Sequence, residues 1–115
     1  MSWIVAPTPL QAWWLLLVAG VLEVAWAIGM KWTDGFSRPG PTAVVVTVAL
    51  ASFALLGLAM KALPAGTAYA VWVGIGAAGT ALLGIWLFDE PATVARIGCV
   101  LLIVAGVIGL KLLHT

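Results

Sequence analysis

The chain has 115 residues, of which 64% are hydrophobic and only 8% are charged, and its mean hydropathy is +1.21. Soluble domains carry roughly a quarter charged residues, so this chain has too little polar surface for a water-facing globule and is expected to lie in a bilayer. A net charge of +1 with scattered basic residues argues against nucleic acid as a partner. Four spans of about 20 residues each would occupy the chain as a single transmembrane domain.

The first expected membrane helix covers residues 13–30 and contains the acidic residue Glu23 about two-thirds of the way along. An ionisable group at such depth costs about 2.5–3.5 kcal/mol on insertion scales, so it normally faces a cavity or a partner. Glu23 is therefore the leading candidate for function. The alternative is a structural pair between Glu23 and a buried cation. No Lys or Arg lies at comparable depth in the four expected spans, which argues against that alternative.

Two neighbours share the helix face of Glu23. Gly20, one turn before, is expected to leave space beside the carboxylate, and Trp26, one turn after, carries an indole N–H that needs an acceptor at this depth. A packing role for the Trp26 ring is the alternative. Burial favours the protonated carboxyl of Glu23 and a bound cation favours the carboxylate, so this group could hold either species. That competition is the minimum requirement for proton-coupled antiport.

A segment rich in Gly and Pro at residues 33–41 is expected to form a loop, followed by a second span over residues 42–60. The hydroxyl candidates in this span are Thr47 and Ser52. An isolated serine in a membrane helix usually bonds its own backbone, so Ser52 alone indicates little. A short hairpin at residues 63–66 then leads to the third span.

The third expected span, residues 67–88, carries Tyr69 and Trp72 on one face. Together they offer a phenol, an indole N–H and two aromatic faces suited to a flat cation, although an interfacial aromatic belt is the alternative for Tyr69. The segment 74–79 matches GxGxxG, but it lies inside an apolar span with no preceding strand, so it does not indicate a nucleotide. Its glycines favour a kink or a close helix contact instead.

The fourth expected span, residues 92–113, carries a stripe of mostly small residues, which we interpret as a helix–helix seam for dimerisation. The stripe consists of Cys99, Leu102, Gly106 and Gly109. The single cysteine excludes an internal disulfide. The sequence shows no nucleophile–base pair and no metal-ligand cluster, so neither an enzyme nor a bound metal or cofactor is expected.

The basic residues are nearly balanced between the two ends of the expected bundle. Lys31, Arg38 and Arg96 fall at one end and Lys61 and Lys111 at the other. This balance assigns no orientation by the positive-inside rule. Either the signal is weak, or the chain inserts in both orientations and forms an antiparallel dimer.

Four segments of the sequence closely resemble the small multidrug resistance family, and the resemblance covers essentially the whole chain except the first ten or so residues. They are GVLEVAWA at 20–27, GFSR at 35–38, LPAGTAYAVWVGIG at 63–76 and AGV at 105–107. The resemblance implies an all-α, antiparallel, dual-topology homodimer in the bacterial inner membrane that exchanges cations for protons without a cofactor. It also implies that both copies of Glu23 share one site lined by Tyr69 and Trp72, with the fourth helices as the dimer seam.

Within that family, Trp26 together with Lys31, Ser52 and Lys61 resembles the guanidinium exporter (Gdx) subtype. A carboxylate can meet guanidinium through two parallel N–H···O bonds, and an ordered donor set such as Trp26 and Ser52 would fix its orientation in the substrate site. A bulky cation would collide with Trp26. The expected function is proton-coupled export of guanidinium and small guanidinyl cations, which bind Glu23 in competition with protons. The alternatives are a promiscuous exporter of quaternary ammonium or polyaromatic cations and a non-transporting membrane subunit that serves another protein.

Overall fold

The computed structural model describes residues 7–113, and all regular structure within these residues is helical. Each of the four long helices is long and apolar enough to cross a membrane, which confirms the expected all-α, four-span architecture and a multi-pass membrane protein. The helices are α1 (Pro9–Gly29), α2 (Pro39–Ala59), α3 (Ala65–Leu87) and α4 (Val94–Leu113), with a 3₁₀ helix η1 (Met30–Thr33) after α1.

The first helix begins at Pro9, ahead of the start expected from the apolar run, because a capping box precedes that run. The Thr8 hydroxyl accepts from the Gln11 backbone N–H at 3.2 Å, and the Gln11 side chain accepts from the Thr8 N–H at 3.0 Å. Proline at the first helical position costs no hydrogen bond there. The same reason lets α2 begin at Pro39, inside the segment expected to be a loop.

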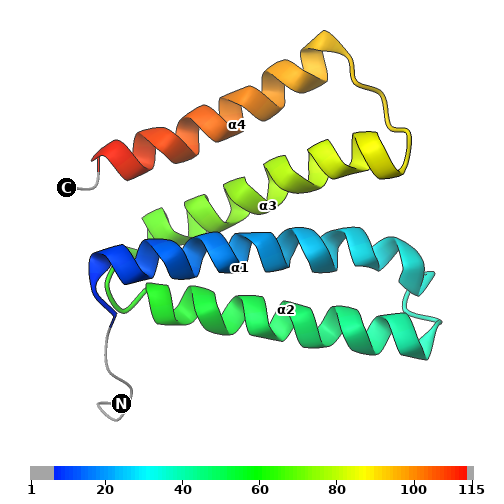
Figure 1. Cartoon of the computed structure of the whole chain (residues 1–115), viewed down its shortest axis with the longest axis horizontal. Helices are drawn as coiled ribbons and strands as arrows, with labels where there is room; N and C mark the ends of the chain where they lie inside the picture. The colour runs from blue at the N-terminus through cyan, green and yellow to red at the C-terminus, as the bar shows by residue number, and fades with distance from the viewer. Residues whose placement is uncertain (1–6, 114–115) are drawn as a thin grey trace.

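The chain reverses sharply between α1 and α2. The Thr33 hydroxyl closes η1 by donating to the Met30 carbonyl at 2.8 Å, and it accepts from the Phe36 N–H at 3.2 Å. Asp34, Gly35 and Phe36 then take φ values of 49°, 67° and 67°, in the left-handed region. This turn lies at the end of the bundle that also carries the α3–α4 connection (Figure 1). The Lys31 amine lies over the Phe88 ring at that end.

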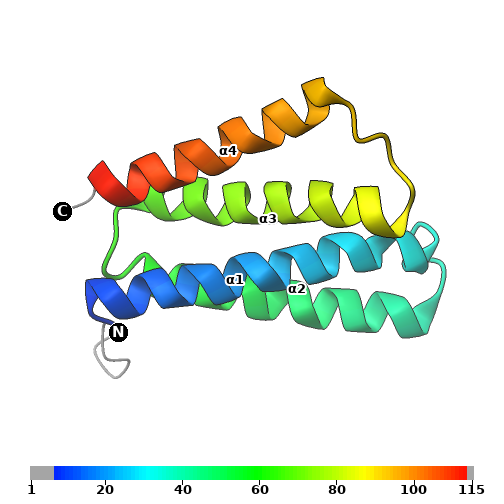
Figure 2. The same ribbon diagram turned by 45° about the horizontal axis from the view of Figure 1, so that its top comes forward.

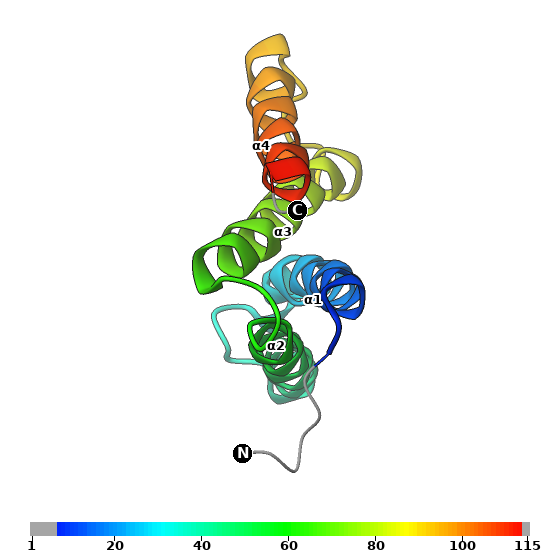
Figure 3. The same ribbon diagram turned by 90° about the vertical axis from the view of Figure 1, so that its left-hand side faces the viewer.

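The helices stack in the order α2, α1, α3, α4, so α1 lies between α2 and α3 while α4 packs mainly against α3 (Figures 1 and 3). Towards the α3–α4 connection, α4 diverges from α3 (Figure 2). The best-packed part of the molecule lies around the first half of α1 and the first half of α3. This core consists of Ala12, Leu16, Ala19, Leu56, Ala59, Leu63, Ala68, Val71 and Trp72.

The glycines of α3 serve close helix contact. The helix continues without a break from Ala65 to Leu87. A Cβ on Gly74 would meet Val107 of α4, and a Cβ on Gly79 would meet Val24 of α1 at 2.5 Å. The segment 74–79 was expected to allow either a kink or a close helix contact, and the structure shows the close contact.

Candidate functional site

Glu23 lies on the side of α1 that faces α3, and its carboxylate rests against Gly76. A Cβ on Gly76 would overlap the carboxylate of Glu23, so only glycine leaves room for it. The other three acidic residues of the chain lie outside the four long helices. Within residues 7–113, no basic side chain forms an ion pair with Glu23, so the structure does not support the buried-pair alternative.

The Glu23 groove is a hollow of about 280 Å³ between α1 and α3. That volume lies just below the range of roughly 300–1,000 Å³ typical of pockets for drug-sized ligands. One chain therefore offers a small site with one carboxylate. The groove is lined by Glu23, Trp26, Ala27, Val73, Gly76, Ala77 and Thr80.

Trp26 brings a free donor to the Glu23 groove. Its indole nitrogen is buried and has no hydrogen-bond partner among the described residues. A buried N–H without a partner costs about 1–3 kcal/mol, so such a group in a binding groove is available to an acceptor there. The acceptor that this N–H is expected to need is not present among the described residues, although Trp26 lines the groove beside Glu23.

Ser52 joins three helices through one hydroxyl. It is completely buried, donates to the Ala19 carbonyl of α1 at 2.7 Å and accepts from the Trp72 indole N–H of α3 at 2.9 Å. Within one chain Ser52, which is expected in the substrate site, does not line the Glu23 groove and bonds other helices instead. Thr47 donates to the Ala43 carbonyl of its own helix at 2.8 Å. The indole N–H of Trp72 is thereby committed, and the residue is buried, with 5% of its surface exposed.

Removal of the Ser52 hydroxyl should destabilise the helix bundle. In Ser52→Ala, the Trp72 N–H and the Ala19 carbonyl both lose a buried partner, so we expect the free energy of unfolding to fall by about 1–2 kcal/mol. Tryptophan fluorescence during unfolding by sodium dodecyl sulfate measures this. Thr47→Ala is the matched control, because Thr47 is exposed and bonds only within its own helix. Equal stability of the two variants would contradict the assigned role.

Tyr69 and Trp72 do not line the Glu23 groove, but a row of aromatic rings connects them to it. Tyr69 and Trp72 pack with ring centroids 5.6 Å apart, Phe53 lies 5.4 Å from Trp72, and Trp26 lies 6.2 Å from Phe53. The sequence analysis missed Phe53, although it is the one aromatic residue of α2. Within one chain, the row therefore runs from Tyr69 through Trp72 and Phe53 to Trp26, which lines the groove.

Gly20 has a different role from the one expected. A Cβ at this position would meet the Ile75 side chain at 2.5 Å, so the space beside Gly20 is filled by α3 instead of being open beside the carboxylate. Gly20 therefore sets how closely α1 and α3 approach each other.

The predicted seam on α4 lies away from the groove and is largely uncovered in the single chain. Cys99 is exposed, Leu102 keeps 74% of its surface, and a Cβ at Gly106 or Gly109 would meet nothing within 4 Å.

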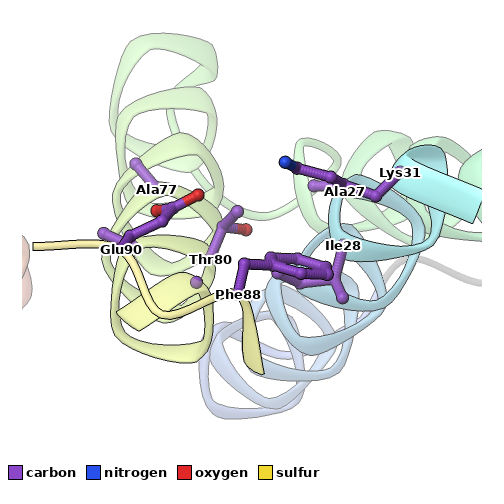
Figure 4. A pocket seen from close by; sticks show the side chains of 9 residues that line it. Ala27, Ile28, Lys31, Ala77, Thr80, Phe88 and Glu90 are labelled. Carbon is purple, nitrogen blue, oxygen red and sulfur yellow. The ribbon is translucent and has the colours of Figure 1, made fainter. Parts of the chain in front are cut away.

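A second cavity, the mouth cavity, adjoins the Glu23 groove at the end of the bundle and has a volume of about 320 Å³. Ala27, Ala77 and Thr80 line both spaces. Figure 4 shows Lys31 and Glu90 on opposite walls, with Phe88 between them. The hydroxyl oxygen of Thr80 is buried without a partner among the described residues. Thr80 was not among the predicted site residues, although it carries the one hydroxyl in the second half of α3.

Comparison with known proteins identifies related chains. A family model described as Small Multidrug Resistance protein matches residues 11–113. A guanidinium exporter of Yersinia pseudotuberculosis is 59% identical over 102 residues, which cover 89% of this chain and 98% of the relative. Guanidinium exporters of Salmonella typhimurium and Escherichia coli K12 are 56% and 55% identical over 102 residues, covering 89% of this chain and 97% of each relative.

Proposed function

Because this chain belongs to the small multidrug resistance family, we propose that it exports guanidinium and small guanidinyl cations in exchange for protons, with Glu23 as the group that binds both. The chain is a transporter and not an enzyme. The observation that carries the proposal is the position of Glu23. It is the one acidic residue of the four long helices, it lies in a groove beside a free indole N–H, and it has no ion-pair partner within the described residues.

The chemistry of the groove suits a small planar cation. A guanidinium ion carries N–H donors and no acceptor, so a carboxylate is the group that can hold it through two parallel hydrogen bonds. The Trp26 N–H cannot donate to guanidinium, and its useful partner is a carboxylate oxygen of Glu23. Trp26 is therefore a positioning residue that holds the carboxylate in the plane of the ligand. Its ring also takes space that a bulky cation would need.

Competition at Glu23 couples the two fluxes. The protonated carboxyl releases its proton to one side, and the resulting carboxylate binds guanidinium. The protein then opens to the other side, where a proton displaces the substrate. A site that holds either species but not both couples outward movement of the cation to inward movement of the proton.

The working unit is an antiparallel homodimer in the bacterial inner membrane, with α4 as the seam. Two observations support this. Only 6% of the apolar stretch of α4 is buried in the single chain. The glycines of α4 leave room for close approach of another helix. Trp26 is the one aromatic residue that lines the groove in a single chain, so a second copy would be needed to bring Tyr69 and Trp72 to the ligand.

Flux in liposomes tests the function. Purified protein should drive uptake of guanidinium into vesicles with an acidic lumen, because protons leaving down their gradient exchange for entering cations, and reversing the gradient should reverse the flux. Tetraphenylphosphonium, a bulky lipophilic cation, should compete poorly. Tight tetraphenylphosphonium binding without guanidinium flux would instead indicate a multidrug exporter. No flux of either cation would indicate a non-transporting subunit.

A further inference from the structure

The mouth cavity contains two groups that bind cations, and each is occupied by a cation of the chain itself. The Glu90 carboxylate pairs with the Arg96 guanidinium at 3.4 Å. The Phe88 ring lies beneath the Lys31 amine, which is 4.9 Å from the ring centroid. In Figure 4 the Glu90 carboxylate is turned into the space between the walls. A carboxylate and an aromatic face are both groups that can hold a flat cation.

The fold holds Glu90 in this position. Asp89 turns the chain with a φ of 57°, and the Glu90 N–H then donates back to the Gly84 carbonyl at 3.4 Å. A Cβ on Gly84 would approach the Glu90 carboxylate oxygen to 2.5 Å, so glycine makes room for it. The carboxylate therefore lies over the last turn of α3, at the negative end of the helix dipole.

The mouth cavity continues into the Glu23 groove. Ala27 and Ala77, which have small side chains, line both spaces, as does Thr80. The Thr80 hydroxyl oxygen is buried without a partner among the described residues, and it can accept from a passing N–H donor. A cation that leaves Glu23 towards this end of the bundle therefore meets Thr80 and then Glu90.

The bond between Glu90 and Arg96 is weak enough to exchange. Their side chains keep 35% and 43% of their surfaces, and one nitrogen–oxygen contact joins them. Exposed pairs of this kind contribute little to stability. The side chain of Arg96 ends in a guanidinium group, the same chemical group as the proposed substrate, so a free guanidinium ion can form the same bond with Glu90.

We propose that Glu90 is a second guanidinium-binding carboxylate at the opening of the path to Glu23, and that the Arg96 side chain competes with the substrate for it. This inference rests on the proposed function. In an antiparallel dimer, one such carboxylate would stand at each side of the membrane.

Kinetics of guanidinium uptake into liposomes under a fixed pH gradient test this site. Glu90→Gln should raise the KM for guanidinium about two- to fivefold and leave the maximal rate unchanged, because an exposed ion pair with the substrate is lost. Arg96→Ala should lower the KM by a similar factor, because the competitor is gone. In the double variant, the Arg96→Ala effect should vanish, since its partner is absent. Asp89→Asn is the matched control, because it removes one charge from the same loop and Asp89 does not line the cavity.

A KM in Glu90→Gln equal to that of Asp89→Asn would overturn the inference. So would an Arg96→Ala effect that persists in the double variant, or a loss confined to the maximal rate. If Glu90→Gln does not yield folded protein, the lowered KM of Arg96→Ala decides the question alone. Wild-type protein that drives no guanidinium flux would overturn the proposed function, whereas normal wild-type flux with an unchanged KM in Glu90→Gln overturns only this site.

Discussion

Replacement of Glu23 by glutamine should abolish both guanidinium binding and proton-coupled uptake. The amide has nearly the shape of the carboxyl group but carries no charge and does not take up a proton, so it offers neither of the two competing ligands a site. Loss of one partner from a desolvated, hydrogen-bonded charge pair costs about 2–5 kcal/mol, which corresponds to binding at least about thirtyfold weaker. Calorimetric titration of the purified protein with guanidinium and flux in liposomes measure the two effects.

Two controls make the Glu23→Gln result specific. Asp34→Asn removes a carboxylate from the loop between α1 and α2, outside the long helices, and should transport like the wild type. Glu23→Asp keeps an ionisable group in the groove and should retain coupled flux at a reduced rate. Normal guanidinium uptake by Glu23→Gln would remove the basis of the proposed mechanism.

Substitution of Gly76 by alanine should disable the site while leaving the fold intact. The new methyl group would occupy the space of the Glu23 carboxylate. Because the displaced atoms belong to the end of a flexible side chain, the carboxylate can rotate away and the helices need not separate. Loss of a charged hydrogen bond costs about 1.5–3 kcal/mol, so guanidinium binding should weaken about ten- to hundredfold. The same titration measures this change.

Gly57→Ala is the matched control for Gly76→Ala, because Gly57 lies within α2 and a Cβ there would meet nothing within 4 Å. Both variants should keep the far-ultraviolet circular dichroism of the wild type, and only Gly76→Ala should lose affinity. Wild-type affinity in Gly76→Ala would show that the contact between Gly76 and Glu23 does not shape the site. A loss of helical signal would contradict the expectation that only the side chain moves.

The architecture and the leading candidate residue could be predicted from the sequence, because both follow from the cost of polar groups in lipid. Backbone groups in a bilayer must bond within their own segment, so long apolar runs become helices without reference to their neighbours. Glu23 was identified by its depth in such a run, which is a property of one segment. The start of α1 at Pro9 differed from the prediction because the Thr8–Gln11 capping box is a local polar signal outside the apolar run.

The partners of each side chain could not be predicted in this way. Helical periodicity shows which residues share a face, but it does not show which helix that face meets. Ser52 is expected from the sequence as a donor in the substrate site, but its hydroxyl bonds Ala19 of α1 and Trp72 of α3. Gly20 is expected to leave open space, but Ile75 of α3 fills that space. Phe53 and Thr80 were missed for the same reason, because each matters only through residues on other helices.

The sequence by itself thus determined four membrane-spanning helices and one deep carboxylate, since hydrophobic cost is summed along a single segment. The tertiary structure decided what surrounds that carboxylate. Gly76 makes room for Glu23, Trp72 is held by Ser52, and a second carboxylate, Glu90, lines the cavity that adjoins the Glu23 groove. These features depend on distances between helices, which side-chain packing sets and which hydropathy does not specify.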